Sequence, residues 1–172
     1  KAKTINFGLL YGMGSQKLSD TLQISTKEAK ELIESYFASF PTVKEFLESI
    51  KEGAKRDGFV ETLFGRKRFF DFKNIGARDE ATYLREAVNT VFQGSAADII
   101  KCAMLKIDEY ITQNNINARM VLQIHDELIF ECDEKEAQEA ASIFQGLMES
   151  VVNLSVPLKT SVNIGKNWGE LK

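Results

Sequence analysis

Two apolar runs separated by only three polar residues constrain the fold of this chain more than any other feature. The runs are Met120–Ile124 and Leu128–Cys132, with His125-Asp126-Glu127 between them. Short apolar segments that flank a polar turn are typical of a β-hairpin. The sequence therefore predicts two antiparallel strands with a polar tip near residue 126.

Helical patterns occupy the first part of the chain. Residues 4–11 form a short apolar segment that is closed by two nearby glycines. Ser25 and Glu28 have the spacing of a capping box, which predicts that a longer helix begins there. Pro41 is expected to end this helix, and Thr42 to open the next one.

The remaining segments complete a mixed pattern. Residues 59–64 and 158–164 have the composition or alternation of strands, and residues 137–151 have helical spacing. Residues 78–113 read as two helices almost end to end, with a break or kink at Gly94. The fold class predicted from this order of elements is α+β.

The composition fits a folded domain. The 172 residues are 44% hydrophobic, enough to bury a sizeable core, which excludes an intrinsically disordered tail or a collagen-like repeat. No apolar run approaches the roughly 20 residues needed to span a bilayer, and the first residues lack the apolar stretch of a signal peptide. We therefore expect a soluble, cytoplasmic protein with no membrane partner. Cys102 and Cys132 form no C-x-x-C pair and are interpreted as small hydrophobic residues.

The charge of the chain gives no global sign of a nucleic-acid partner. The formal net charge is −3, made up of +3 over residues 1–70 and −6 over residues 71–172. Binding to DNA or RNA must therefore rest on local sites. A single histidine, His125, excludes a zinc site built from several histidines.

The tip of the predicted hairpin places Asp126 and Glu127 at an accessible point on a rigid scaffold. Carboxylate oxygens are the hard ligands that Mg²⁺ prefers, so this position suits phosphoryl or nucleotidyl transfer. An ordinary solvated turn would have the same residues. A site for two metal ions also needs a second carboxylate from elsewhere, and local spacing identifies none.

One face of the first helix carries a cation and two aromatic rings. Lys3, Phe7 and Tyr11 are four residues apart, which places them on the same side of an α-helix. Such a face could meet a triphosphate, a sugar and a base, because Lys binds phosphate and aromatic rings stack on bases. An aromatic stripe packed in a core is the alternative.

A polar stripe follows the same spacing later in the chain. Arg85, Asn89 and Gln93 can all donate hydrogen bonds to the minor-groove acceptors that every base pair presents. A solvated helix face is the alternative. Arg66 lies in a short basic run near a predicted strand end, where it could contact phosphate or belong to a basic surface turn.

Four segments in order along the chain resemble the motifs of family A DNA polymerases, of the bacterial DNA polymerase I type. Residues 3–12, KTINFGLLYG, are similar to motif B, the fingers helix, and residues 123–128, QIHDEL, to motif C, the palm hairpin. The segments ETLFGR at 61–66 and QGSAAD at 93–98 also match. The resemblance covers essentially the whole chain.

The resemblance implies a role for each matching residue near the reaction. Asp126 is expected to be a ligand of a catalytic Mg²⁺ pair, with Glu127 as its supporting neighbour. Lys3 is expected to contact the phosphates of the incoming dNTP. Phe7 would pack on the dNTP sugar and discriminate against dideoxynucleotides, and Tyr11 would lie at the insertion site.

Other matching positions are expected to hold the primer–template DNA. Arg66 would touch the template backbone. The remaining positions lie near the growing end of the primer: Arg85, Asn89, Gln93, Gln123 and His125.

The resemblance further implies a right-hand polymerase fold. Residues 1–92 would form a mostly helical part of the fingers, and residues 93–172 a part of the palm with its antiparallel hairpin. The family's other metal-binding aspartate lies in motif A, which resembles DYSQIE, and no such segment occurs in the 172 residues. We therefore expect the chain to be the C-terminal portion of a longer enzyme, with motif A and the thumb in cis. The 172 residues alone are expected to be inactive.

The parent enzyme would add dNTPs to a primer 3′-hydroxyl by nucleotidyl transfer assisted by two Mg²⁺ ions, in replication and repair. Two other functions stay open. One is a non-catalytic fragment that binds primer–template or nucleotide. The other is a single-subunit phage-type RNA polymerase, which has a similar motif B and an His-Asp pair. Phe7 and residues 123–128 favour a DNA polymerase.

Overall fold

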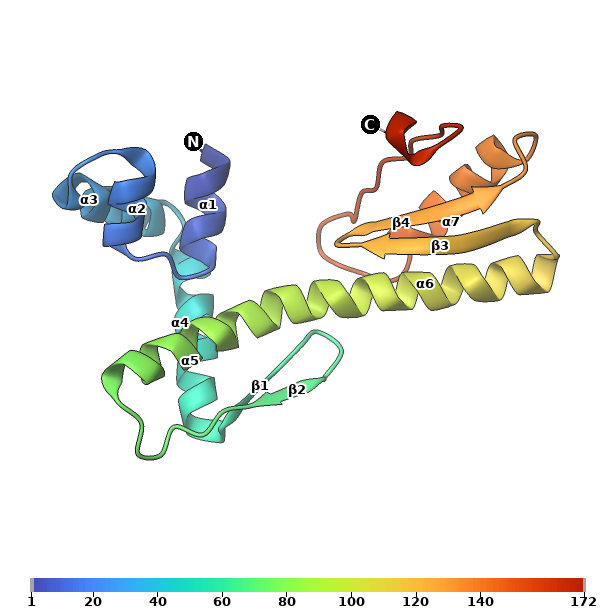
Figure 1. Cartoon of the computed structure of the whole chain (residues 1–172). Coiled ribbons are helices and arrows are strands. Elements are labelled where there is room, and N and C mark those ends of the chain that lie inside the picture. The colour runs from blue at the N-terminus through green and yellow to red at the C-terminus, as the bar shows by residue number, and fades with distance from the viewer. Residues whose placement is uncertain (1, 172) are drawn as a thin grey trace. The chain divides into compact units, whose positions relative to one another are not determined.

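The computed structural model describes residues 2–171, and their side chains from residue 5 to residue 171. The chain divides into two compact units, Lys1–Ser95 and Ala96–Lys172. This division lies close to the boundary predicted between residues 92 and 93, whereas the assignment of the two parts to fingers and palm stays a prediction. Figure 1 shows a first unit that is mostly helical and a second built around a hairpin.

The first unit contains helices, one π-helix and one small hairpin. Its elements are α1 (Ala2–Leu10), α2 (Ser15–Leu22), α3 (Thr26–Ser39), α4 (Pro41–Asp57), β1 (Phe59–Glu61), β2 (Lys67–Phe69), α5 (Ala77–Asn89) and the π-helix η1 (Thr90–Gly94). Helix α6 (Ser95–Asn114) begins at the last residue of this unit and continues into the second.

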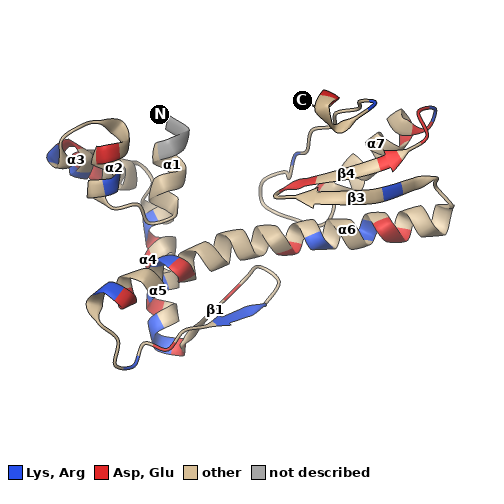
Figure 2. Ribbon diagram, in the orientation of Figure 1, with Lys and Arg blue, Asp and Glu red and all other residues tan. Residues whose placement is uncertain are grey.

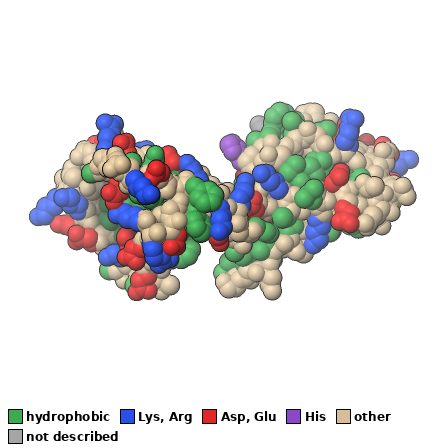
Figure 3. All heavy atoms as spheres, turned by 90° about the horizontal axis from the view of Figure 1, so that it is seen from below, with side chains coloured by type: hydrophobic (Ala, Val, Ile, Leu, Met, Phe, Trp, Pro, Cys, Tyr) green, Lys and Arg blue, Asp and Glu red, His purple; other side chains and the backbone are tan. Residues whose placement is uncertain are grey.

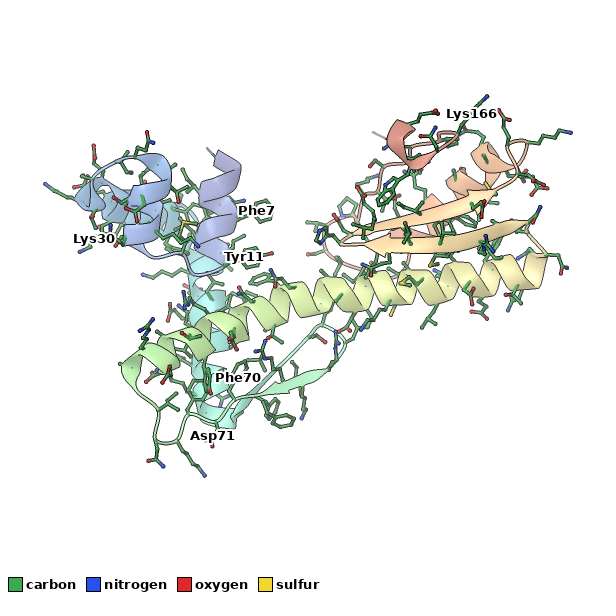
Figure 4. All side chains as sticks on the ribbon, viewed as in Figure 1. Phe7, Tyr11, Lys30, Phe70, Asp71 and Lys166 are labelled. Carbon is green, nitrogen blue, oxygen red and sulfur yellow. The ribbon has the colours of Figure 1, made fainter. Side chains whose placement is uncertain are left out.

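Two hydrophobic clusters hold the first unit together. Leu9, Leu18 and Ala29 bring α1, α2 and α3 into contact. Leu47 of α4 and Val88 of α5 belong to a second cluster, together with Val60 of β1. The second cluster extends to Phe70, which Figure 4 labels between the helices and the small hairpin.

The predicted start of α3 is set by a local sequence signal, whereas the predicted start of α4 is not. The predicted capping box is confirmed, because Ser25 Oγ accepts the Glu28 N–H at 3.2 Å and the Glu28 carboxylate accepts the Ser25 N–H at 2.8 Å. The predicted start of α4 at Thr42 is wrong, because α4 begins at Pro41 with Phe40 as its N-cap. Proline suits the first helical position, where its missing N–H would have no partner within the helix.

The strand predicted over residues 59–64 is shorter than expected. It ends at Glu61, and Thr62 donates its N–H to the Arg66 carbonyl at 3.0 Å in a tight turn. Gly65 has φ +79°, the left-handed conformation that glycine adopts without steric cost. The chain therefore reverses and continues as β2, a strand that the sequence analysis missed, which pairs with β1 in antiparallel register.

The second unit contains the predicted hairpin and its supporting helices. Its elements are the rest of α6, β3 (Ala118–Ile124), β4 (Glu127–Cys132), α7 (Ala137–Glu149) and the short 3-10 helix η2 (Trp168–Glu170). The core of this unit forms where Ile107 of α6 meets Ala140 and Phe144 of α7. The Phe144 ring lies against Phe130 of β4, with ring centroids 4.6 Å apart. Figure 1 shows the hairpin running alongside α6.

The strand predicted over residues 158–164 is wrong, because this segment is irregular in the structure. Two side chains of α7 bond the main chain in its middle. Thr160 donates its N–H to Glu149 Oε1 at 2.8 Å, and Gln145 Nε2 donates to the Thr160 carbonyl at 2.7 Å. Helix side chains therefore satisfy the backbone groups that a neighbouring strand would have paired.

Candidate functional site

The tip of the β3–β4 hairpin is a two-residue turn. Ile124 and Glu127 are paired across the strands, so His125 and Asp126 alone form the turn and Glu127 belongs to β4. His125 has φ +53°, a left-handed conformation that is uncommon for a residue with a side chain. Gln123 Nε2 donates to the His125 carbonyl at 2.7 Å, which supports the turn from one side. The hairpin thus presents four of the predicted site residues together.

The two carboxylates at this tip are accessible. Asp126 and Glu127 are both exposed. A metal ion that also binds a substrate needs ligands that the substrate can reach. The adjacent acids fit one side of a Mg²⁺ site in the chemistry of their oxygen donors. Among residues 2–171, however, no group of three or more His, Cys, Asp or Glu side chains could hold a metal ion. The donor set is therefore partial among the residues that the structure describes.

Phe7 of helix α1 and Tyr11, in the turn directly after the helix, lie on one side, as their spacing predicts. Phe7 and Tyr11 stack with their ring centroids 6.4 Å apart and their planes 20° apart. Both side chains project in the same direction in Figure 4, and Phe7 is 46% exposed. Tyr11 also meets the edge of Phe92, at 6.4 Å between ring centroids. The side chain of Lys3, the third predicted residue of this face, lies outside the described residues.

The polar stripe on α5 does not continue as one regular face. Arg85 and Asn89 lie on α5, whereas Gln93 lies in the π-helix η1. A π-helix has i→i+5 hydrogen bonds and a wider turn, so a step of four residues no longer completes one turn. Gln93 is therefore rotated away from the position that a continuous α-helix would give it.

The burial of these polar residues also differs. Arg85 and Gln93 are exposed, whereas Asn89 is half-buried. The Asn89 Oδ1 atom is buried and has no hydrogen-bond partner in the part of the chain that the structure describes. Because a side-chain amide has donors as well as an acceptor, the Asn89 NH₂ group is the part suited to donate outward.

Arg66 lies next to the π-helix. Its Nη2 atom donates to the Gly94 carbonyl at 3.3 Å, directly after Gln93 in the sequence. The neighbouring basic residues form ion pairs: Lys67 with Glu61 at 3.2 Å, and Arg68 with Glu86 at 2.5 Å. Figure 2 shows β2 as a basic segment among mixed charges. Arg66 and Gln93, far apart in the sequence, are thus brought to one place.

Sequence reasoning missed the contact that brings Arg66 close to Gln93. The turn after β1 lies against the start of α6, where the Leu63 N–H donates to Ser95 Oγ at 2.8 Å. Leu63 and Ser95 belong to the two shorter matching segments, ETLFGR and QGSAAD. Their presence as separate motifs was visible in the sequence, but nothing local indicated that they touch.

The two cysteines are free thiols and half-buried. Burial raises the pKa of the Cys132 thiol, and the nearby acids Asp133 and Glu136 add to this effect. A thiol held in its protonated form is a poor nucleophile and metal ligand, which agrees with a packing role for Cys132.

Comparisons with known proteins place these motifs in one family. The family model of DNA polymerase family A matches residues 1–170. This chain belongs to DNA polymerase family A, and the resemblance seen in the sequence is thereby confirmed.

Two curated relatives are bacterial DNA polymerases. The chain is 51% identical over 172 residues to DNA polymerase I of Helicobacter pylori, covering 99% of this chain and 19% of that protein. It is 44% identical over 170 residues to the thermostable DNA polymerase I of Thermus aquaticus, covering 97% of this chain and 20% of that protein. The chain thus spans about a fifth of the length of the curated relatives it matches.

A solved structure has the same fold. It is the POL domain of Pol1 from M. smegmatis in complex with DNA primer-template and dNTP, which matches with a TM-score of 0.94 and 37% sequence identity. The match covers 98% of this chain and 30% of that one. The predicted α+β class, with helices and small antiparallel hairpins, is confirmed. Among the residues that the structure describes, no helix has the length and apolar character needed to cross a membrane.

Proposed function

We propose that this chain is part of a DNA-directed DNA polymerase that extends a primer with dNTPs in replication and repair. The observation that carries the proposal is the match, over 98% of the chain, to a POL domain in complex with DNA primer-template and dNTP. The family match and the exposed acids at the hairpin tip support it. A DNA-copying enzyme acts where the chromosome lies, so we place it in the bacterial cytoplasm.

The reaction joins a primer to a nucleotide. The 3′-hydroxyl oxygen attacks the α-phosphate, a new P–O bond forms, and the bond to the departing pyrophosphate breaks while the hydroxyl loses its proton. The carboxylate of Asp126 would bind Mg²⁺, and Glu127 would support Asp126. A bound Mg²⁺ pair supplies stabilisation of the negative charge on the attacking and leaving oxygens.

The nucleotide would be held by residues of the first unit, and the DNA by residues of both units. Phe7, 46% exposed on α1, is suited to pack on the dNTP sugar, and Tyr11 beside it to occupy the insertion site. Lys3 would neutralise charge on the triphosphate. The residues proposed to contact primer–template, which include two from the hairpin of the second unit, are Arg66, Arg85, Asn89, Gln93, Gln123 and His125.

The 172 residues alone would not catalyse the reaction. Two adjacent carboxylates at the hairpin tip are too few ligands to fix two metal ions, and the described residues contain no larger acidic cluster. The missing ligand would come from motif A in the same polypeptide, and the thumb would complete the grip on DNA. Templated extension by the purified 172-residue chain, lost on Asp126→Ala, would contradict this part of the proposal.

The test of the function uses the full-length polymerase that contains this chain. Asp126→Asn keeps the size of the side chain and removes its charge, so turnover should fall by orders of magnitude while the affinity for primer–template changes little. Asp108→Asn, at an exposed acid on α6, is the matched control and should leave both quantities unchanged. Near-normal turnover in the Asp126 variant would exclude a metal-binding role.

Assays with the same full-length protein also distinguish the two alternative functions. A preference for rNTPs over dNTPs in primer extension would indicate a phage-type RNA polymerase. Salt-dependent binding to primer–template without any extension by the full-length protein would indicate a non-catalytic binding protein.

A further inference from the structure

The β1–β2 hairpin contacts both ends of the π-helix η1. At the start of η1, Arg68 Nη1 donates to Thr90 Oγ1 at 3.2 Å. At its end, Arg66 Nη2 donates to the Gly94 carbonyl at 3.3 Å, and the Leu63 N–H donates to Ser95 Oγ at 2.8 Å. All of these residues lie in the first unit. Gln93 therefore lies in a short segment that is held on both sides.

Ser95 is the residue through which the turn and the π-helix are joined. Its hydroxyl accepts the hydrogen bond of Leu63 and donates one to the Val91 carbonyl at 2.5 Å. Its own backbone N–H also reaches the carbonyls of Phe92 and Val91. A hydroxyl has one donor and can accept, so a single side chain satisfies groups on both elements.

The packing beneath these bonds is close. A Cβ atom at Gly94 would lie 2.8 Å from Thr62 Cγ2, a distance that real Cβ atoms do not tolerate. Thr62 is itself buried and accepts the Arg66 N–H on its Oγ1 at 3.1 Å. The turn can therefore approach the helix only because residue 94 has no side chain.

A π-turn is a local widening that is rarely stable by propensity and is common at functional sites. Here it determines the direction of Gln93, and the hydroxyl of Ser95 ties the end of the widened turn to the β1–β2 hairpin. We propose that Ser95 is a positioning residue that holds η1 in place and thereby directs the Gln93 side chain toward primer–template DNA. This inference rests on the proposed function, because it assigns a task to Gln93.

The experiment compares variants of the full-length polymerase. Ser95→Ala removes both hydrogen bonds and should raise the dissociation constant for primer–template about three- to tenfold. Ser95→Thr keeps the hydroxyl, which in a helix can still bond the carbonyl four residues earlier, and should restore affinity. Ser39→Ala is the matched control, because the exposed Ser39 makes the same kind of bond, from its Oγ to the Ser35 carbonyl at 2.9 Å.

A double variant distinguishes positioning from a general loss of stability. If Ser95 acts through Gln93, the variant Ser95→Ala/Gln93→Ala binds DNA no more weakly than Gln93→Ala alone. Hydrogen exchange gives a readout without DNA: the Leu63 amide should be protected in the Ser and Thr forms and exchange rapidly in the Ala form. Circular dichroism confirms that each variant is folded.

Each outcome has one meaning. If Gln93→Ala binds DNA normally, the proposed contact of Gln93 fails, and the positioning role fails with it. If Gln93→Ala weakens DNA binding but Ser95→Ala weakens it further in the double variant, the positioning role alone is overturned. The same holds if Ser95→Ala by itself leaves the affinity for DNA unchanged. An unprotected Leu63 amide in the unaltered protein would exclude the tie itself.

Discussion

Gly12 and Arg85 meet where helix α1 ends. A Cβ atom at Gly12 would lie 3.1 Å from Arg85 Cγ, and Gly12 has φ +78°. The turn that follows the helix of Phe7 therefore lies directly against α5. Only glycine combines this left-handed backbone with so close an approach at no cost.

Replacing Gly12 should destabilise the first unit. We expect Gly12→Ala to lower the free energy of unfolding by about 1–2 kcal/mol, because the left-handed conformation is costly for a residue with a Cβ. Gly14→Ala is the control, since Gly14 has φ −79° and a Cβ atom added there would have no neighbouring side chain or backbone within 4 Å. Urea unfolding followed by circular dichroism measures both. Equal losses in the two variants would contradict a special role for Gly12.

The capping box should make stability depend on pH. Hydrogen bonds from the Ser25 side chain and backbone hold the pKa of Glu28 below its ordinary value of 4.5. A pKa lowered by folding stabilises the protein above the unfolded value, and this contribution is lost as the pH falls through the folded value. Glu28→Gln should therefore lower the melting temperature at pH 7 and have little effect at about pH 2. Glu34→Gln, on the same helix but away from the capping box, is the matched control.

Phe7 should control the choice of sugar. Phe7→Tyr places a hydroxyl beside the proposed sugar position and should raise dideoxynucleotide incorporation at least about tenfold. The ratio of incorporation efficiencies for dideoxynucleotides and dNTPs measures this in the full-length enzyme. Phe40→Tyr, at a residue 51% exposed on another part of the first unit, is the control. Unchanged discrimination would remove Phe7 from the sugar contact.

The backbone and the side chain of His125 can be tested separately. His125→Gly relieves the left-handed conformation at φ +53°, so hairpin stability should change by less than about 1 kcal/mol while DNA affinity falls. His125→Asn tolerates the same conformation and keeps a hydrogen-bond donor, so it should lose less affinity. Fluorescence anisotropy with labelled primer–template measures the affinities. Full affinity in the glycine variant would show that the imidazole makes no DNA contact.

The core of the second unit depends on Phe144. This side chain is 5% exposed and packs on Phe130, so Phe144→Ala should cost about 3–5 kcal/mol. Leu105→Ala removes a side chain that is 71% exposed and should change stability by less than about 0.5 kcal/mol. Denaturant unfolding separates the two results. A small loss at Phe144 would mean that the unit repacks around the cavity.

Exposed hydrophobic side chains occur in both units of this chain. Phe69 is 73% exposed and Trp168 is 59% exposed. Figure 3 shows hydrophobic side chains reaching the surface among Lys, Arg, Asp and Glu. Scattered exposed apolar residues are ordinary on a folded protein and indicate no partner by themselves.

The features that could be predicted from the sequence have short-range causes. The capping box depends on residues three apart, and the β3–β4 hairpin on apolar runs that adjoin a polar turn. Phe7 and Tyr11 share a face because their spacing is that of an α-helix. The roles of these residues came from the family resemblance, and they stay predictions.

The features that could not be predicted depend on distant contacts. The π-helix changes the spacing of Gln93, and its ties come from Leu63 and Arg66, about 30 residues earlier. The alternating segment around Thr160 is not a strand, because α7 side chains bond its main chain. Periodicity reports which side of a segment is apolar, but not which neighbour will satisfy its backbone.

The bonds from α7 to Thr160 also bear on how the chain would be degraded. A trypsin-like protease must bind the main chain on both sides of the bond it cuts, so an accessible lysine is not enough. Lys159 is exposed, yet the next residue gives its N–H to Glu149, and its carbonyl accepts from Gln145. The peptide bond after Lys159 is thereby sheltered from cleavage for as long as helix α7 stays folded.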